Sequence, residues 1–75
     1  MNDIEFKLIG DYVELNQLLK LAGVCQSGGA GKRRVAAGEV AVDGQVETRK
    51  TCKIRAGQVV SVDDQRIRVV KQGAA

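Results

Sequence analysis

The chain lacks histidine, proline and tryptophan, and its 75 residues include only two cysteines, one tyrosine and one phenylalanine. Without histidine it has no side chain of the type most often used as a general base near neutral pH, which argues against an enzyme. Cys25 and Cys52 do not form a C-x-x-C pair, so we expect no metal site and no cofactor. No apolar run approaches about 18 residues, so nothing is expected to span a membrane.

The length and composition predict one small domain, residues 1–75, whose core leaves little room for a deep substrate cavity. Hydrophobic residues make up 44% of the chain, which is typical of a folded protein. The N-terminus is acidic and does not resemble a secretory signal, so we expect a cytoplasmic protein. In that compartment the two cysteines are expected to be reduced.

Positive charge is concentrated in one part of the chain. Residues 32–55 carry seven Lys and Arg residues against three acidic residues, a net +4 within a chain of net +3. The cations form two clusters, at 32–34 and 49–55. Charge runs are more often solvated surfaces than binding sites, but both clusters follow glycine or turn signals. Positive charge localised in this way is what a surface that binds a polyanion requires.

The first third of the chain predicts a strand followed by a helix. Residues 4–8 alternate apolar and charged side chains, which indicates a half-buried strand. Leucine and alanine residues at helical spacing predict a helix over 12–22, which Gly23 would end. We expect Asp11 and Glu14 to form a capping box at the start of this helix.

A second helix is predicted between Ser27, a good N-cap, and Gly38. Its several glycines weaken it, so packing against the first helix must supply most of its stability. At helical spacing Gly31 and Val35 share the packed face, which leaves Arg33 pointing most directly to solvent. The free backbone N–H groups of a glycine-rich helix start can also receive a phosphate.

The second half of the chain predicts short strands. Residues 40–46 contain an Asp-Gly hairpin signal of the primed-turn type, and residues 59–70 suggest a second hairpin. We expect 47–57 to be a loop anchored by Ile54. The element order indicates an α+β domain, in which two packed helices precede a small sheet of short strands and the N-terminal strand joins that sheet.

The shortage of aromatic residues narrows the class of polyanion. Phe6 belongs to the apolar face of its strand, and Tyr12 is the only other aromatic residue. Proteins that bind single strands usually stack bases on several aromatic side chains. Folded or duplex RNA, bound by shape through phosphates and 2′-hydroxyls, fits this composition better. The composition does not exclude DNA as the ligand. Arg66 and Arg68 are interpreted as an exposed strand face without an assigned role.

An ordered set of motifs spans about residues 12–62. Its members are Leu15-x-x-Leu18-x-x-x-Ala22-Gly23, Ser27, Gly38-x-Val40-x-Val42-Asp43-Gly44 and Ala56-Gly57-Gln58-x-Val60. This set resembles the S4 RNA-binding domain, which is named for a small-subunit ribosomal protein and built on the αL motif. The resemblance is to its small free-standing bacterial members, the YbcJ-type proteins, and makes 12–62 the core of the domain.

The resemblance implies that RNA is held along the second helix and the adjoining loops. The residues predicted to bind RNA are Ser27, Lys32, Arg33, Arg34, Arg49, Lys50, Lys53 and Arg55. We therefore predict a non-catalytic, monomeric protein that recognises structured RNA, such as ribosomal or transfer RNA, through its backbone. The alternative is a protein-interaction module whose basic face docks on an acidic or ribosome-associated partner.

Overall fold

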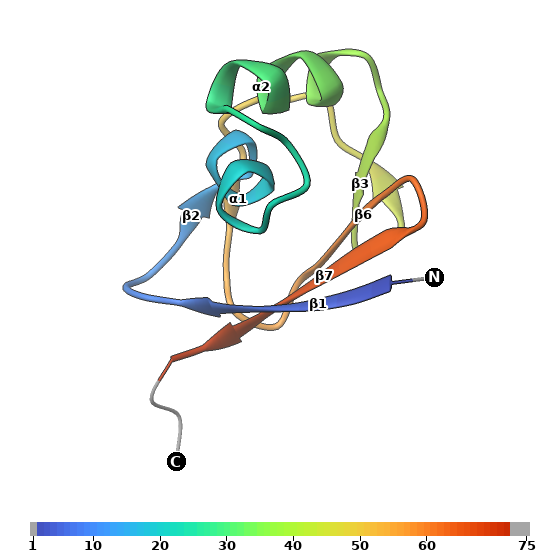
Figure 1. Cartoon of the computed structure of the whole chain (residues 1–75). Coiled ribbons are helices and arrows are strands. Elements are labelled where there is room, and N and C mark those ends of the chain that lie inside the picture. The colour runs from blue at the N-terminus through green and yellow to red at the C-terminus, as the bar shows by residue number, and fades with distance from the viewer. Residues whose placement is uncertain (1, 73–75) are drawn as a thin grey trace.

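The computed structural model describes residues 2–72 and contains two helices beside a mixed five-stranded sheet (Figure 1). The elements are β1 (Asn2–Leu8), β2 (Val13–Glu14), α1 (Leu15–Leu21), α2 (Gly28–Ala36), β3 (Val40–Val42), β4 (Gln45–Val46), β5 (Lys53–Ile54), β6 (Val59–Val62) and β7 (Gln65–Lys71). The sheet order is β1-β7-β6-β3-β4, and β2 pairs with β5 in a separate two-stranded sheet. Among the strand pairs formed by residues 2–72, only β1–β7 is parallel. The predicted α+β fold with an N-terminal strand in the sheet is confirmed.

One apolar core lies between the helices and the sheet. Its buried side chains come from almost every element: Leu8, Leu15, Leu18, Leu19, Val35, Val40, Ile54, Val60, Val62, Ile67 and Val69. The leucine stripe of α1 and the alternating valines of β6 supply much of this set, as their helical and strand periods require. Burying these side chains is the main force that holds the small domain together.

The start of α1 differs from the prediction, and the expected capping box is wrong. The chain before the helix is extended because β2 pairs antiparallel with β5, and Glu14 provides no side-chain cap. Instead, the amide of Leu15 donates to the carbonyl of Cys52 at 2.9 Å, and the amide of Asn16 donates to that of Lys50 at 3.1 Å. Two of the otherwise unsatisfied N–H groups of the helix are thus bonded by the loop before β5.

The second helix begins and ends as predicted. The Ser27 hydroxyl oxygen accepts a hydrogen bond from the Ala30 amide at 3.1 Å, and Gly38 adopts a φ of +76° just beyond the helix. At Gly31 the two helices approach closely, since a Cβ atom there would lie 2.7 Å from the carbonyl oxygen of Asn16. Only glycine permits this distance, so Gly31 sets the spacing between α1 and α2.

The hairpin between β3 and β4 is also confirmed. Asp43 and Gly44 both have positive φ, 51° and 85°, as a type I′ turn requires. The Asp43 carboxylate accepts a hydrogen bond from the amide of Val59 at 2.9 Å, which fastens this turn to β6. The segment predicted to be one loop, 47–57, contains the short strand β5, whose Ile54 is fully buried as expected.

Candidate nucleic-acid interface

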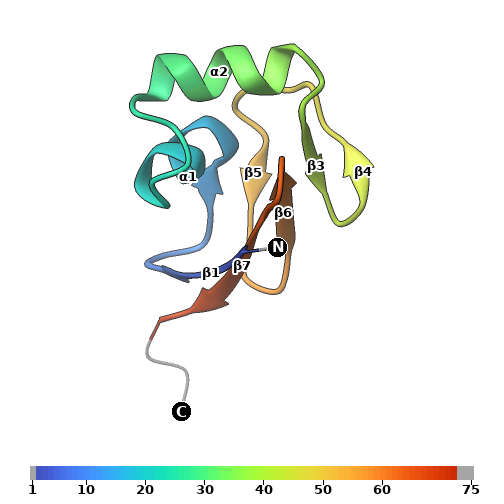
Figure 2. The ribbon, with the colours of Figure 1, turned by 45° about the vertical axis from the view of Figure 1, so that its right-hand side comes forward.

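The backbone of α2 and that of the loop before β5 both contact Asn16, a buried residue of α1. Gly31 of α2 packs against the backbone carbonyl oxygen of Asn16, and the backbone amide of Asn16 donates a hydrogen bond to the carbonyl of Lys50. Figures 1 and 2 both show the segment between β4 and β5 passing alongside α2. Lys32, which follows Gly31 on the helix, and Lys50 on the loop therefore belong to two segments that both contact Asn16.

The cations of α2 fall into two kinds. Lys32 and Arg33 are exposed and form no ion pair with any residue in 2–72. Arg34 lies between two carboxylates: its Nε is 2.6 Å from an oxygen of Glu39, and its Nη2 donates to Asp63 in the β6–β7 turn. The Nε contact is an ion pair without hydrogen-bond alignment.

Arg34 is thus engaged within the protein. The hydrogen bond to Asp63 raises the pKa of Arg34, with burial opposing the change, so the guanidinium stays charged. Its side chain is only 30% exposed. The bond to Asp63 ties the end of α2 to the sheet, which leaves Lys32 and Arg33 as the helix cations available to an external anion.

The loop before β5 is shaped by a local ion pair. Arg49 donates from Nε and Nη2 to the two carboxylate oxygens of Glu47, both at 2.9 Å, and its amide donates to the same carboxylate at 3.0 Å. These bonds lower the pKa of Glu47 to about 2. The Arg49 side chain nevertheless remains 77% exposed. The pair fixes the turn whose carbonyls at Lys50 and Cys52 bond the start of α1.

The remaining predicted cations follow in the same segment. Lys50, Lys53 and Arg55 are exposed, and no ion pair involves them in the described part of the chain. Lys53 and Arg55 lie beside the ring of Tyr12, a residue that the sequence reasoning left without a role. Tyr12 comes close to these cations because β2 pairs with β5, and no pattern in the sequence predicted that pairing.

The predicted contact at Ser27 lies at the opposite end of α2 from Arg34. The hydroxyl oxygen of Ser27 is occupied as the helix cap. The amides of Gly28 and Gly29 make no hydrogen bond among the described residues, and Gly29 is exposed. The first turn of α2 therefore offers unsatisfied donors at the positive end of the helix dipole.

The two arginines of β7 are paired with acids. In the parallel register Asp3 lies opposite Arg66 and Glu5 opposite Arg68. The corresponding ion-pair distances are 3.2 Å and 3.9 Å. The positive charges of Arg66 and Arg68 are thus neutralised locally.

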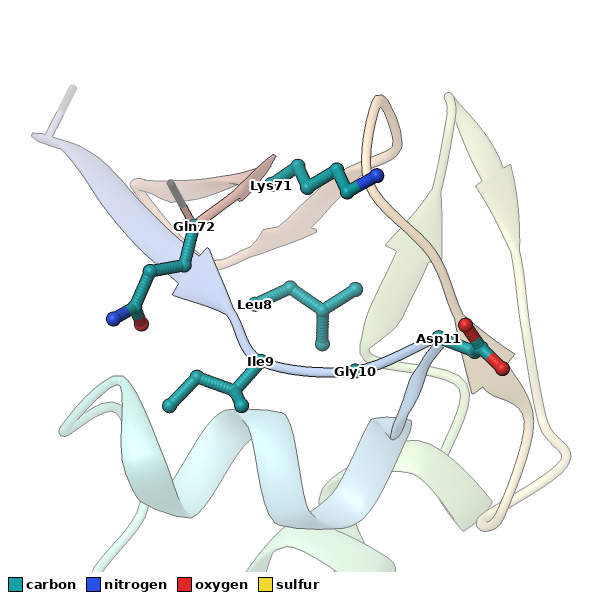
Figure 3. Close-up of a pocket in the computed structure, with 6 residues that line it drawn as sticks. All are labelled: Leu8, Ile9, Gly10, Asp11, Lys71 and Gln72. Atoms are coloured by element: carbon teal, nitrogen blue, oxygen red, sulfur yellow. The ribbon is translucent and has the colours of Figure 1, made fainter. Parts of the chain in front are cut away.

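Two shallow hollows occur on the described surface. One, of about 440 Å³, is lined by Arg49, Thr51, Cys52 and Lys53 and so belongs to the basic loop. The other, of about 450 Å³, is lined by Leu8, Ile9, Gly10, Asp11, Lys71 and Gln72. Figure 3 shows the chain leaving β1 on one side of it, with Lys71 at the end of β7 and Gln72 across from that chain. No residue predicted to bind RNA lines the second hollow.

Cys25 and Cys52 are unpaired, and burial raises the pKa of the Cys52 thiol. Residues 2–72 contain no group of three side chains suited to bind a metal ion. Neither of the described helices has the length and apolar character needed to cross a membrane.

Comparison with known proteins places the chain in a family. A family model described as the S4 domain matches residues 6–70. YbcJ from Escherichia coli (strain K12) and YbcJ from Shigella flexneri are each 54% identical over 59 residues, which covers 79% of this chain and 84% of each relative. The solution structure of E. coli YbcJ, described as revealing an αL motif involved in RNA-binding, is 47% identical. It aligns with a TM-score of 0.65 over 93% of this chain and 87% of that one. The chain belongs to the S4 domain family, as its motifs predicted.

Proposed function

We propose that this protein is a non-catalytic RNA-binding domain that recognises structured RNA, such as ribosomal or transfer RNA, through the sugar–phosphate backbone. The observation that carries the proposal is that α2 and the loop before β5 both contact the buried residue Asn16 through their backbones, at Gly31 and at Lys50. These two neighbouring segments and residues 53–55 carry five cations that form no ion pair among residues 2–72: Lys32, Arg33, Lys50, Lys53 and Arg55. The membership of the S4 domain family and the described RNA-binding motif of E. coli YbcJ support it.

In this proposal Lys32 and Arg33 bind phosphates along the helix, and the free amides at the start of α2 next to Ser27 bind one more. The second wall of the interface comes from the basic loop and β5: Arg49, Lys50, Lys53 and Arg55. Arg34 acts as a positioning residue at the edge of this surface, because its bonds to Glu39 and Asp63 hold the end of α2.

The proposal further holds that residues 1–75 act as one monomeric domain in the cytoplasm. A domain of this kind needs no cofactor and no catalytic residue, because binding by charge and shape involves no bond making. Any chemistry performed on the bound RNA would then come from a partner protein.

The test compares two double substitutions that remove the same charge. Lys32→Ala with Arg33→Ala should weaken binding to a transfer RNA and lower the salt-dependence slope by about 1 for each lost phosphate contact. Arg66→Ala with Arg68→Ala should change both quantities much less, because these arginines are already paired with acids. Fluorescence anisotropy titrations over a range of salt concentrations measure both quantities.

Equal losses in the two double variants would contradict the proposed surface, since only net charge would then matter. Unchanged affinity of the helix variant at low salt would also contradict it. A titration in which an acidic polypeptide displaces transfer RNA at much lower concentration than unlabelled transfer RNA does would favour the protein-interaction alternative.

A further inference from the structure

The only tyrosine of the chain lies beside two cations that have no acidic partner among the described residues. Tyr12 precedes β2 and is 43% exposed, whereas the other aromatic residue, Phe6, packs against the core. The Nζ atom of Lys53 lies 4.9 Å from the centre of the Tyr12 ring, and the Cζ atom of Arg55 lies 6.0 Å from it. These are cation–π distances, so the ring and both cations form one exposed cluster.

The pairing of β2 with β5 creates this cluster. Extending the antiparallel register by one residue places Tyr12 opposite Arg55. Ile54 is buried in the core, so the alternation of a strand leaves Lys53 and Arg55 on the outer side. Glu14, opposite Lys53 in the register, lies within ion-pair distance of no cation among residues 2–72.

Lys53 also lines a shallow hollow on the surface. It has a volume of about 440 Å³ and is lined by Arg49, Thr51, Cys52 and Lys53. Lys53 therefore lies between an exposed aromatic ring and a recess that carries a second cation, Arg49, whose side chain is largely exposed. An exposed aromatic ring beside cations matches the chemistry of a nucleotide, which has an aromatic base and charged phosphates.

We propose that Tyr12 stacks an unpaired nucleobase, while Lys53 and Arg55 bind the phosphates that flank it; this inference rests on the proposed RNA-binding function. Unstacked bases in loops, bulges and helix ends are commonly bound by stacking on tyrosine. One ring accommodates one base. The ligand class is therefore a structured RNA that presents an unpaired nucleotide next to a helical segment, with the helix bound through α2 and the basic loop.

The composition of the chain provides a direct measurement. Tyr12 is the only tyrosine and there is no tryptophan, so intrinsic tyrosine fluorescence reports on this ring alone. The probes are a short blunt RNA duplex and the same duplex with one unpaired adenosine in a bulge. Stacking should quench the emission of the unsubstituted protein on binding the bulged duplex and leave it largely unchanged with the blunt duplex.

Substitutions then separate stacking from a structural role of the ring. Tyr12→Leu should lower affinity for the bulged duplex by about 5- to 150-fold, the loss of one stacked base. Tyr12→Phe should retain that affinity, and neither change should alter affinity for the blunt duplex. As a control, Lys32→Ala with Arg33→Ala should weaken binding of both RNAs equally.

Each outcome decides the question. Equal affinity for both RNAs with unquenched emission would overturn the inference and leave the proposed function intact. Equal losses for both RNAs in Tyr12→Leu would also overturn it, because the ring would then only hold the two cations in place. Failure of the unsubstituted protein to bind either RNA would overturn the proposed function and the inference together. The quenching result does not depend on whether the leucine variant folds.

Discussion

The arginines of β7 and the cations of the 32–55 segment differ in what surrounds them. Arg66 and Arg68 each lie opposite an acid of β1 in the parallel register, and both form ion pairs. In the 32–55 segment five of the seven cations form no ion pair with any described residue. Both regions contain arginines, but only in the 32–55 segment do some of them, Arg33 and Arg55, keep their charge unpaired among residues 2–72.

This difference shows that the arrangement of acids, more than the number of cations, distinguishes a candidate binding surface. Exposed ion pairs contribute only about 0–1 kcal/mol each, so the pairs between β1 and β7 add little to stability. Their effect is to neutralise the charges of Arg66 and Arg68. The unpaired cations of the 32–55 segment remain available to neutralise RNA phosphates, which would release the counterions condensed on the RNA and so drive binding.

Gly31→Ala should have the largest effect, because it disturbs the packing of α1 against α2, the helix that carries Lys32 and Arg33. The added Cβ would lie 2.7 Å from the backbone oxygen of Asn16, which cannot move away without shifting α1. Alanine normally stabilises a helix relative to glycine by about 1 kcal/mol. Here we expect a loss of about 1–3 kcal/mol in the free energy of unfolding, measured by urea denaturation.

Gly29→Ala is the matched control, since it lies in the same helix and its added Cβ would meet only Ser27 Oγ at 3.8 Å. This change should be neutral or slightly stabilising. If Gly31→Ala were as stable as Gly29→Ala, Gly31 would not set the spacing between the helices.

Arg34→Ala tests a paired cation that lies within the basic segment itself. The side chain is bonded to Glu39 and Asp63, so its loss should lower the free energy of unfolding by about 1–2 kcal/mol. RNA affinity at a temperature well below unfolding should fall less than it does in the Lys32 and Arg33 double variant. Thermal unfolding and anisotropy titration give the two numbers. A loss of affinity equal to that of the double variant, with unchanged stability, would make Arg34 a direct RNA contact.

The elements that the sequence predicted correctly depend on signals a few residues apart. The Ser27 cap bonds an amide three residues later, and the turn at Asp43 and Gly44 needs two adjacent residues that tolerate positive φ. The apolar periods of β1 and α1 likewise repeat within each element. Such patterns survive in the folded protein because the local preference and the tertiary packing agree.

The features that escaped prediction join distant parts of the chain through groups that every residue has. The start of α1 is bonded by the carbonyls of Lys50 and Cys52, and no side-chain type marks a carbonyl for this use. The strands β2 and β5 have two residues each, too few to show an alternating pattern. The partner of Arg34, Asp63, lies 29 residues away, so the sequence alone could not separate this arginine from its unpaired neighbours.

The smallest expected effect concerns Arg49, because protonation of Glu47 at low pH would convert this paired cation into an unpaired one. The bonds from Arg49 lower the pKa of Glu47 from 4.5 to about 2. A carboxylate with a lowered pKa stabilises the folded loop fully above its ordinary pKa, and this contribution disappears as pH falls from about 4.5 to about 2.

The carboxyl carbon chemical shift of Glu47 should therefore titrate with a midpoint near 2 in the unsubstituted protein. In Arg49→Gln the midpoint should rise toward the ordinary value, since glutamine keeps a hydrogen-bond donor but removes the charge. A midpoint at the ordinary value in both proteins would mean that Arg49 is not held by Glu47 in solution, and that it belongs with the unpaired cations of the same segment.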